Sequence, residues 1–443
     1  MKIPQPPPTL EDLFDREDLE VLERILVSDV KASQGGHYRH WDEIRFREPP
    51  EGMSVEDWWF AIKFARRREY HPLPLADTGG HPFIYMMPDK AWERVHKVDQ
   101  RLGGRITLGE EVANPSTRDR YLVNSLIEEA ITSSQLEGAT TSKQVAKDMI
   151  KSGRSPRDKS ERMILNNYHA MNFIRENRNE QLTPAFVLEL HRMVTDGTLE
   201  RPEMAGRAQL PGEDRIKVLD RATGDILHEP PPADQLPERL KKMCEFANGE
   251  KLETFLHPVV RAIIVHFWLA YDHPFDDGNG RTARALFYWS MLSQGYWLAE
   301  FLTISSILTK APVQYARLFL YTETDDNDLT YFIMYQLQVI MRAINGLEGY
   351  LQRKMAEVKR TEKLIKQLGT LNHRQTALLN HALRHPDHPY TVKSHSLSHN
   401  IAIQTARTDL ESLVERGLLE KQKVGKGYTF HPVEDLSGKL KSE

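Results

Sequence analysis

The sequence contains almost no cysteine and no long apolar run. Its single cysteine, Cys244, cannot form a disulfide within the chain, which is usual for a protein of a reducing compartment. The longest apolar segments, such as residues 262–271, reach about half of the ~20 residues that a membrane-spanning helix needs. The N-terminus also lacks the apolar stretch of a secretory signal peptide. We therefore expect a cytoplasmic protein without a membrane partner.

The chain also lacks a charge excess of either sign. The 59 Lys and Arg residues nearly balance the 63 Asp and Glu residues, so the net charge of −4 gives no basic field that would favour nucleic acid over the whole chain. A hydrophobic share of 40% is enough for ordinary globular cores. The length of 443 residues allows two to four domains.

Apolar spacing predicts a mainly α-helical protein. Residues 1–114 should form a helical accessory region, with loops at Pro- and Gly-rich segments such as 71–82. The basic run at 66–68 is typical of a solvated helix face. Residues 115–345 are almost continuously helical, residues 346–372 form a charged helical connector, and residues 373–435 form a separate small domain.

One segment of the central region departs from the helical pattern. Two short apolar runs, 216–219 and 226–227, flank a turn that contains Gly224. This spacing predicts a β-hairpin inside a helical domain. Because a lone hairpin needs a surface to lie against, we expect a lid or an edge strand.

The stretch HPFDDGNGRTAR, residues 273–284, predicts an anion site between two apolar helices. Its glycine-rich turn directs successive backbone N–H groups to one point at a helix N-terminus. Arg281 and Arg284 are three residues apart and share a helix face. Two guanidiniums beside converging amides suit a polyphosphate. The turn consists of Gly278, Asn279 and Gly280.

Two further residues of this stretch fit phosphate chemistry. Asp277 offers a hard oxygen ligand for Mg²⁺ on phosphates, and His273 has the ordinary pKa of a general base. The simpler alternative is a capped helix start, with Asp277 or Asn279 as the cap and both arginines on the surface. The helix dipole disfavours two arginines at an N-terminus unless an anion binds there.

The same stretch resembles the signature of the Fic family, H-x-F-x-D/E-G-N-G-R-x-x-R, with every defined position filled. Segments 190–194, 205–209 and 227–243 also resemble the family, and the resemblance covers roughly residues 115–340. It implies a Fic-type helical core with a β-hairpin flap. The implied activity is adenylylation, the transfer of AMP from ATP to a Ser, Thr or Tyr hydroxyl of a protein.

The resemblance also implies a role for each site residue. His273 would deprotonate the target hydroxyl, and Asp277 would hold Mg²⁺. Tyr315 resembles an adenine-pocket residue, whereas Thr322 stands where some relatives have Asn. The phosphates would be held by Gly278, Asn279, Gly280, Arg281 and Arg284. The target peptide would add as a strand to the flap, which includes Ile216, Lys217, Val218 and Leu219.

A second motif, SSQLEG, lies upstream in a helix expected near residues 121–138. Ser133 and Glu137 are four residues apart and share a helix face. The simple interpretation is a helix that stops at Glu137, since Gly138 suits a helix end. The motif also resembles the family's inhibitory motif, S/T-x-x-x-E-G/N. This resemblance implies that Glu137 pairs with Arg284, where the γ-phosphate should lie, and in some relatives this glutamate also supports removal of AMP.

Residues 373–435 resemble a winged helix-turn-helix domain. A helix, a short helix, a turn at Asn400, a longer helix and a hairpin follow one another. In a DNA-binding domain of this kind the longer helix reads the major groove and the wing approaches phosphates. The candidate DNA-binding residues are Gln404, Thr405, Arg407 and Lys426. A winged helix used for protein contact or dimerisation is the alternative.

The leading hypothesis is therefore an autoinhibited protein adenylyltransferase that uses ATP and Mg²⁺ and acts on a protein, which can be the enzyme itself. Proteins with this resemblance dimerise, so a homodimer is expected. One alternative is a DNA-binding regulator whose Fic domain senses nucleotide, although such a sensor would not need His273 as a base. Another alternative keeps the enzyme and exchanges the donor.

Overall fold

The computed structural model describes residues 2–14, 19–103, 115–220, 223–250, 254–367, 371–424 and 427–442. The chain divides into two compact units. The first comprises Met1–Ile106 and Ser125–Ile344, and the second comprises Thr107–Asn124 and Asn345–Glu443. Two long helices, α7 (Pro115–Leu136) and α16 (Thr330–Gln367), contribute to both units. The mainly α-helical prediction is confirmed, because the described residues form only two-stranded sheets.

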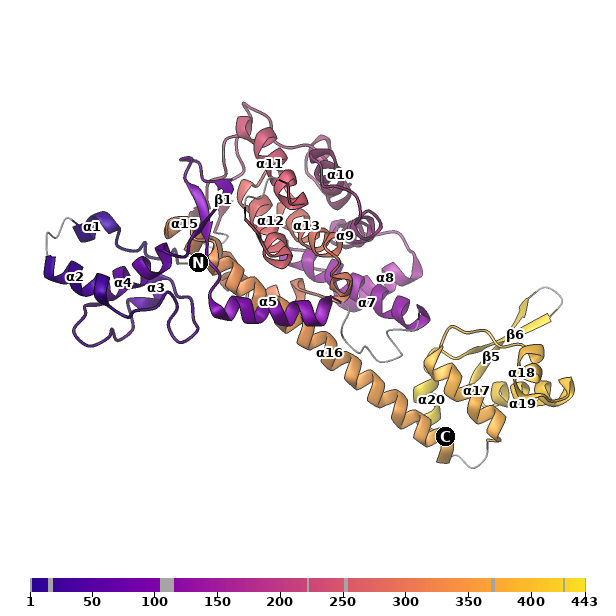
Figure 1. Ribbon diagram of the computed structural model, residues 1–443. Helices are drawn as coiled ribbons and strands as arrows, with labels where there is room; N and C mark the ends of the chain where they lie inside the picture. Colours follow the sequence, from indigo (N-terminus) through magenta and orange to yellow (C-terminus); the bar gives the residue numbers. More distant parts are fainter. Residues whose placement is uncertain are drawn as a thin grey trace. The chain divides into compact units, whose positions relative to one another are not determined.

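The N-terminal part of the first unit is a small helical layer followed by a hairpin (Figure 1). Helix α4 starts at a capping box in which Ser54 and Asp57 exchange hydrogen bonds. The tryptophans of α3 and α4 belong to one buried apolar cluster. The elements are α1 (Leu10–Phe14), α2 (Leu19–Val27), α3 (Trp41–Ile44), α4 (Val55–Arg67), β1 (His71–Ala76), β2 (Pro82–Tyr85) and α5 (Asp89–Leu102).

The loop predicted at 71–82 is wrong in part, because β1 and β2 pair there as antiparallel strands. Proline is tolerated at the edge of a two-stranded sheet, where a missing N–H faces no partner strand. The hairpin continues into the turn between α15 and α16. Ile84 N–H donates to the Asn327 carbonyl at 3.1 Å, and Leu329 N–H donates to the Ile84 carbonyl at 2.8 Å.

A buried ionic network joins the N-terminal layer to the same turn. Lys63 Nζ lies 2.7 Å from Asp325 Oδ1, and Arg66 Nη1 lies 3.7 Å from Asp325 Oδ2. Arg66 is only 1% exposed, so the solvated face predicted for residues 66–68 is wrong at this position. Burial alone would raise the pKa of Asp325, but the neighbouring cations Lys63 and Arg66 hold that pKa below its ordinary value.

Two buried helices, α12 (Pro258–Asp272) and α13 (Asn279–Ser293), form the centre of the first unit (Figure 1). Helix α12 is mostly apolar and is buried on nearly every side, as expected for a helix without a solvent face. It packs on α13 and α11, while α9 and α10 pack on α13. The surrounding elements are α8 (Lys143–Ser152), α9 (Lys159–Glu176), α10 (Pro184–Thr195), η1 (Pro202–Met204), η2 (Ala233–Gln235), α11 (Leu236–Asn248), η3 (Trp297–Phe301), α14 (Ser305–Leu308) and α15 (Pro312–Thr324).

The predicted hairpin is present and shorter than expected. Strands β3 (Val218–Leu219) and β4 (Ile226–His228) pair antiparallel, with a register shift between the two pairs. Ile216 and Lys217 precede β3 rather than belonging to it. Gly224, with φ of +77°, supplies the left-handed turn residue. We call residues 216–228 the flap.

The C-terminal part of the second unit has the element order expected of a winged helix. Asn400, with φ of +48°, ends α18 as a left-handed cap. Gln404, Thr405 and Arg407 are exposed on the first half of α19, whereas Lys426 lies outside the described residues. The assignment to that fold stays a prediction. The elements are α17 (His373–Arg384), α18 (Val392–His399), α19 (Ile403–Glu415), β5 (Leu419–Val424), β6 (Gly427–Pro432) and α20 (Leu436–Ser442).

Across the described part of the chain, no helix combines the length and apolarity needed to cross a membrane.

The ionic network leads to a stability prediction. Asp325→Asn should lower the free energy of unfolding by about 3–5 kcal/mol, because Lys63 and Arg66 would then be buried beside a neutral group. The matched control is Asp326→Asn. The Asp326 carboxylate also lies 3.0 Å from Lys63 but is 70% exposed, so its removal should cost about 0–1 kcal/mol. Urea denaturation measures both, and equal effects would contradict the prediction.

Candidate active site

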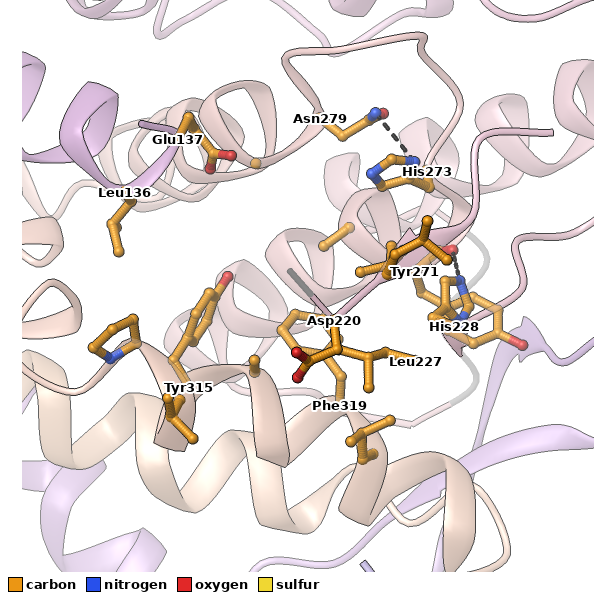
Figure 2. A pocket seen from close by; sticks show the side chains of 18 of the residues that line it. Leu136, Glu137, Asp220, Leu227, His228, Tyr271, His273, Asn279, Tyr315 and Phe319 are labelled. Atoms are coloured by element: carbon orange, nitrogen blue, oxygen red, sulfur yellow. Dashed lines mark hydrogen bonds between the residues drawn. The ribbon is translucent and has the colours of Figure 1, made fainter. Parts of the chain in front are cut away.

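A cavity of about 520 Å³ lies where the central helices meet the flap (Figure 2). Five elements or their ends surround it: α7, the flap, α12, α13 and α15. Apolar and aromatic side chains line much of the cavity, and charged groups come from several of the surrounding elements. The charged and polar lining residues include Glu137, Asp220, His273, Asn279, Arg284 and Glu323.

His273 is the residue that ends α12, and its backbone is left-handed, with φ of 44° and ψ of 53°. A side chain in this region costs roughly 1–2 kcal/mol, so the surroundings must hold it there. Asn279 Nδ2 lies 3.3 Å from His273 Nδ1. Burial, followed by the nearby charges of His228 and Arg215, lowers the pKa of His273 to about 4. The ring is therefore neutral near pH 7.

The side chain of Asn279 bonds the backbone of the loop between α12 and α13. Its Oδ1 accepts from Phe275 N–H at 3.0 Å, and its Nδ2 donates to the Phe275 carbonyl at 2.8 Å. These two bonds determine which way the amide points, so Nδ2 must be the group that faces His273. Phe275 itself is fully buried.

His191 supports the loop from α10 and was not singled out by the sequence. Its ring stacks on Phe275 with centroids 3.7 Å apart and planes inclined by 4°. Nδ1 accepts from Gly206 N–H at 3.0 Å, and Nε2 donates to the Asp277 carbonyl at 2.9 Å. Burial lowers the pKa of His191 to about 4, so the ring stays neutral with one donor and one acceptor. The only sequence signal for this support was the family resemblance of segments 190–194 and 205–209, which contain His191 and Gly206.

Two glycines of the motif stand where a Cβ atom would clash with a neighbouring side chain. Gly278 has φ of +87°, and a Cβ there would lie 2.6 Å from Thr195 Cγ2. Gly280 has a helical backbone, but a Cβ there would overlap Glu137 Oε1. The first turn of α13 is therefore open to an approaching anionic oxygen, and that oxygen belongs to Glu137 in this structure.

Arg284 is held by the two residues of the SSQLEG motif. Its Nη2 lies 2.7 Å from Glu137 Oε1, and its Nε donates to Ser133 Oγ at 2.9 Å. The same Nη2 donates to the Ser133 carbonyl at 3.0 Å. The ion pair expected between Glu137 and Arg284 is thus present, with Arg284 only 2% exposed.

Arg281 lies deeper and is less fully paired. Its Nη1 donates to the Val194 carbonyl at 3.0 Å, while its buried Nε and Nη2 have no hydrogen-bond partner among the described residues. Asp277 Oδ1 lies 3.5 Å from Nη2. Burial lowers the pKa of Arg281 from its ordinary value. Two unbonded N–H groups on a buried cation fit an anionic ligand.

The aromatic wall of the cavity comes from α15. Tyr315 Oη lies 2.9 Å from His266 Nε2, and Phe319 packs edge-on against Tyr315 with centroids 5.5 Å apart. Thr322 is absent from the cavity lining and donates to the Leu318 carbonyl within its own helix at 3.0 Å. The wall is mainly apolar, and its two aromatic rings stand nearly perpendicular to each other, at 84°.

Only part of the predicted flap set lines the cavity. Val218 and Leu219 do, whereas Ile216 and Lys217 do not. Asp220 and Leu227 line it in their place, and Figure 2 shows the Asp220 carboxylate pointing into the cavity.

Comparison with known proteins finds similarity over part of the region that surrounds the cavity. Residues 181–291 match the model of the Fic/DOC family. The chain is 31% identical over 119 residues to protein adenylyltransferase Fic of Nematostella vectensis, covering 27% of this chain and 25% of that protein. It is 30% identical over 152 residues to protein adenylyltransferase fic-1 of Caenorhabditis elegans, covering 33% and 27%. The chain therefore matches about a quarter of the length of these curated relatives.

A solved structure resembles the fold over a larger share. A Fic family protein from Desulfovibrio desulfuricans G20 superposes with a TM-score of 0.51 at 17% identity, covering 79% of this chain and 98% of that one. This likeness extends well beyond the matched domain and concerns the fold alone.

The contact between Gly280 and Glu137 leads to a prediction. Gly280→Ala should destabilise the wild type but not a Glu137→Gly variant, because alanine suits a helix once the carboxylate is gone. A double-mutant cycle from urea denaturation should give a coupling free energy of about 1 kcal/mol. Gly346 is the control, since it is helical and a Cβ there meets nothing within 4 Å. Gly346→Ala should add to Glu137→Gly without coupling, and absence of coupling for Gly280 would contradict the prediction.

Proposed function

We propose that this chain is an autoinhibited protein adenylyltransferase, because residues 181–291 match the Fic/DOC family model. It moves AMP from ATP to a Ser, Thr or Tyr hydroxyl of a protein. The observation that carries the proposal is one cavity that holds a neutral His273 beside a helix N-terminus and Arg284.

The residues present suit each step of the transfer. The triphosphate would lie along the first turn of α13, with Arg281 and Arg284 binding its terminal phosphates. The target oxygen attacks the α-phosphorus, so an O–P bond forms while the bond to the β-phosphate oxygen breaks and pyrophosphate leaves. The hydroxyl proton passes to the ring of His273. Catalysis of this kind depends on positioning and on fixed positive charge.

Mg²⁺, when bound, would neutralise phosphate charge, and Asp277 is the carboxylate that would hold it. That carboxylate is 49% exposed and lies directly before the glycine turn. Across the described residues, no three His, Cys, Asp or Glu side chains form a metal cluster. The remaining ligands would therefore be phosphate oxygens and water, as is common for Mg²⁺.

The aromatic wall with Tyr315 would take the adenine, and the flap would take the target. Strand β3 is paired with β4 on one edge only among the described residues. An extended peptide can add to the other edge by backbone hydrogen bonds, which would bring its hydroxyl toward His273.

Autoinhibition follows from the position of Glu137. Its carboxylate occupies the first turn of α13 and pairs with Arg284, where a terminal phosphate would otherwise bind. ATP could then bind only with its phosphates displaced, which removes the in-line geometry of attack. We extend the proposal to removal of AMP, with the same carboxylate orienting the attacking water.

The inhibition is tested by Glu137→Gly. This change should raise adenylylation about 10²-fold, because displacement of reacting atoms by about 1 Å costs that much. The measurement is transfer of label from ATP carrying a labelled α-phosphate, to the protein itself and to lysate proteins. His273→Ala in the same background should abolish it.

Glu128→Gly is the matched control. Glu128 lies within α7, the helix that Glu137 directly follows, and pairs with Lys143. Its replacement by glycine tests whether loosening of α7 alone raises activity. Labelling of the Glu137→Gly variant at the wild-type level would refute autoinhibition.

We also propose that the C-terminal unit binds duplex DNA through α19. The supporting observation is that Gln404, Thr405 and Arg407 are exposed on the first half of this helix, the part that reads the major groove in such domains. A protein-contact role is the competing outcome.

Arg407→Gln should weaken binding of the full chain to a pool of short random-sequence duplexes by about 5-fold or more, because a charged contact to DNA is lost. Fluorescence anisotropy at two salt concentrations measures it. Lys439→Gln, on α20, serves as the control and should change little. Absence of wild-type binding at low salt would refute DNA binding.

A further inference from the structure

Two side chains donate hydrogen bonds to the backbone carbonyls at the C-terminal end of α12, next to His273. One side chain directly precedes the flap, and the other belongs to its last residue. Arg215 Nη2 donates to the Asp272 carbonyl at 2.7 Å and to the His273 carbonyl at 3.1 Å. His228 Nε2 lies 2.6 Å from the Tyr271 carbonyl. The last carbonyls of a helix have no partner within the helix, so three consecutive ones are satisfied here from outside.

The hydrogen-bond acceptors around both bonding groups favour their charged forms. Arg215 is always charged. His228 faces two acceptors, the Tyr271 carbonyl at Nε2 and Glu323 Oε2 at 2.9 Å from Nδ1. A ring that donates from both nitrogens must be protonated. Burial opposes this, but the hydrogen bond and charge of Glu323 raise the pKa of His228 above its ordinary value.

We propose that Arg215 and His228 are positioning residues, which together hold His273 in its left-handed conformation and set the electrostatic surroundings of its ring. The proposal rests on the proposed function for the role of His273 as a base. We call the two residues the Arg215–His228 pair. Both side chains bond the backbone beside the His273 ring, so each acts through that backbone and through its charge.

The orienting effect follows from the bonds. A non-glycine residue at positive φ persists only when its surroundings hold it. The Arg215–His228 pair fixes the peptide groups of residues 271–273, and the partial negative charge at a helix C-terminus favours cations there. Arg215 is additionally held by the Pro231 carbonyl at 2.7 Å and by Gln209.

The charge effect follows from the surroundings of His273. Glu137 and Asp277 favour its protonated form, whereas His228 and Arg215 oppose that form. His228 in turn faces Glu323 and Asp272, and Asp272 is paired with Arg239 Nε at 2.7 Å. Burial is thus the main reason for the low pKa of His273, and Arg215 and His228 lower it further against the two carboxylates.

The pair also joins the flap to the base. Arg215 directly precedes the flap, and His228 belongs to β4. A peptide added to β3 would therefore be positioned against the same backbone that carries His273. Glu323, which holds the proton of His228, lies on α15 and lines the cavity.

The test uses two variants of the full chain that remove charge but retain a donor, Arg215→Gln and His228→Gln. Histidine ring carbons are labelled for NMR, and the His273 signal is identified by its loss in His273→Ala. The pKa of His273 should rise by about one pH unit in each variant, because a nearby positive charge has been removed. Arg192→Gln and His169→Gln, exposed residues of α10 and α9, should leave it unchanged.

Activity supplies the second measurement. In the Glu137→Gly background each variant should lower kcat about 10-fold while the KM for ATP changes less than about 2-fold, since the nucleotide contacts are intact. Restoring charge and donors with Arg215→Lys should recover part of kcat. If Arg215→Gln fails to fold, His228→Gln still decides, because its amide can donate to the Tyr271 carbonyl.

An unchanged His273 pKa in both variants would overturn the charge effect, and an unchanged kcat would overturn the orienting effect. The NMR titration needs no ATP and no target. If the wild type and Glu137→Gly proteins transfer no AMP, the proposed function fails, and the titration still decides whether the pair controls His273.

Discussion

The positive end of α13 is the constraint on which the rest of the site depends. Unpaired backbone N–H groups and the buried guanidinium of Arg284 must meet negative charge, since a buried cation without a partner is costly. In this structure the charge comes from Glu137 at 2.7 Å. A terminal phosphate would satisfy the same groups, so the carboxylate and the nucleotide exclude each other at this point. Under the proposed function, that exclusion is the regulation.

Much of this arrangement could be predicted because its information is local. The glycine turn, the two arginines and the histidine lie within twelve residues, 273–284, and their chemistry follows from residue type and spacing. Ser133 and Glu137 share a face because they are four residues apart. The ion pair with Arg284, 147 residues away, was predicted from charge complementarity together with family resemblance.

The supporting residues could not be predicted in the same way. Arg215 meets a carbonyl 57 residues away, and His228 meets a carboxylate 95 residues away. Neither contact has a local pattern, because a backbone carbonyl leaves no trace in the sequence. The prediction that Arg66 faces solvent was wrong for a related reason. A run of three arginines is typical of a solvent-facing helix, and the distant carboxylate that pairs with Arg66 cannot be recognised from the run itself. The sequence therefore predicted the residues proposed to bind the ligand, but not the residues that support them.

Helix α15 links the cavity wall, the contact with His228 and the contact with the N-terminal layer. Its middle supplies the aromatic wall with Tyr315 and Phe319, and its end supplies Glu323, which holds the proton on His228. Directly beyond, Asp325 is fixed by Lys63 from the N-terminal layer.

Tyr321, on the same helix, stacks on His40 with centroids 4.3 Å apart. The left-handed backbone of His273 and the partly unpaired Arg281 cost stability at the site, and such costs are offset elsewhere in a fold. The buried network of the N-terminal layer is well placed to offset them, because it fixes the end of the helix that borders both the nucleobase wall and the flap. None of the residues of the N-terminal layer lines the cavity, so its contacts reach the site through the end of α15.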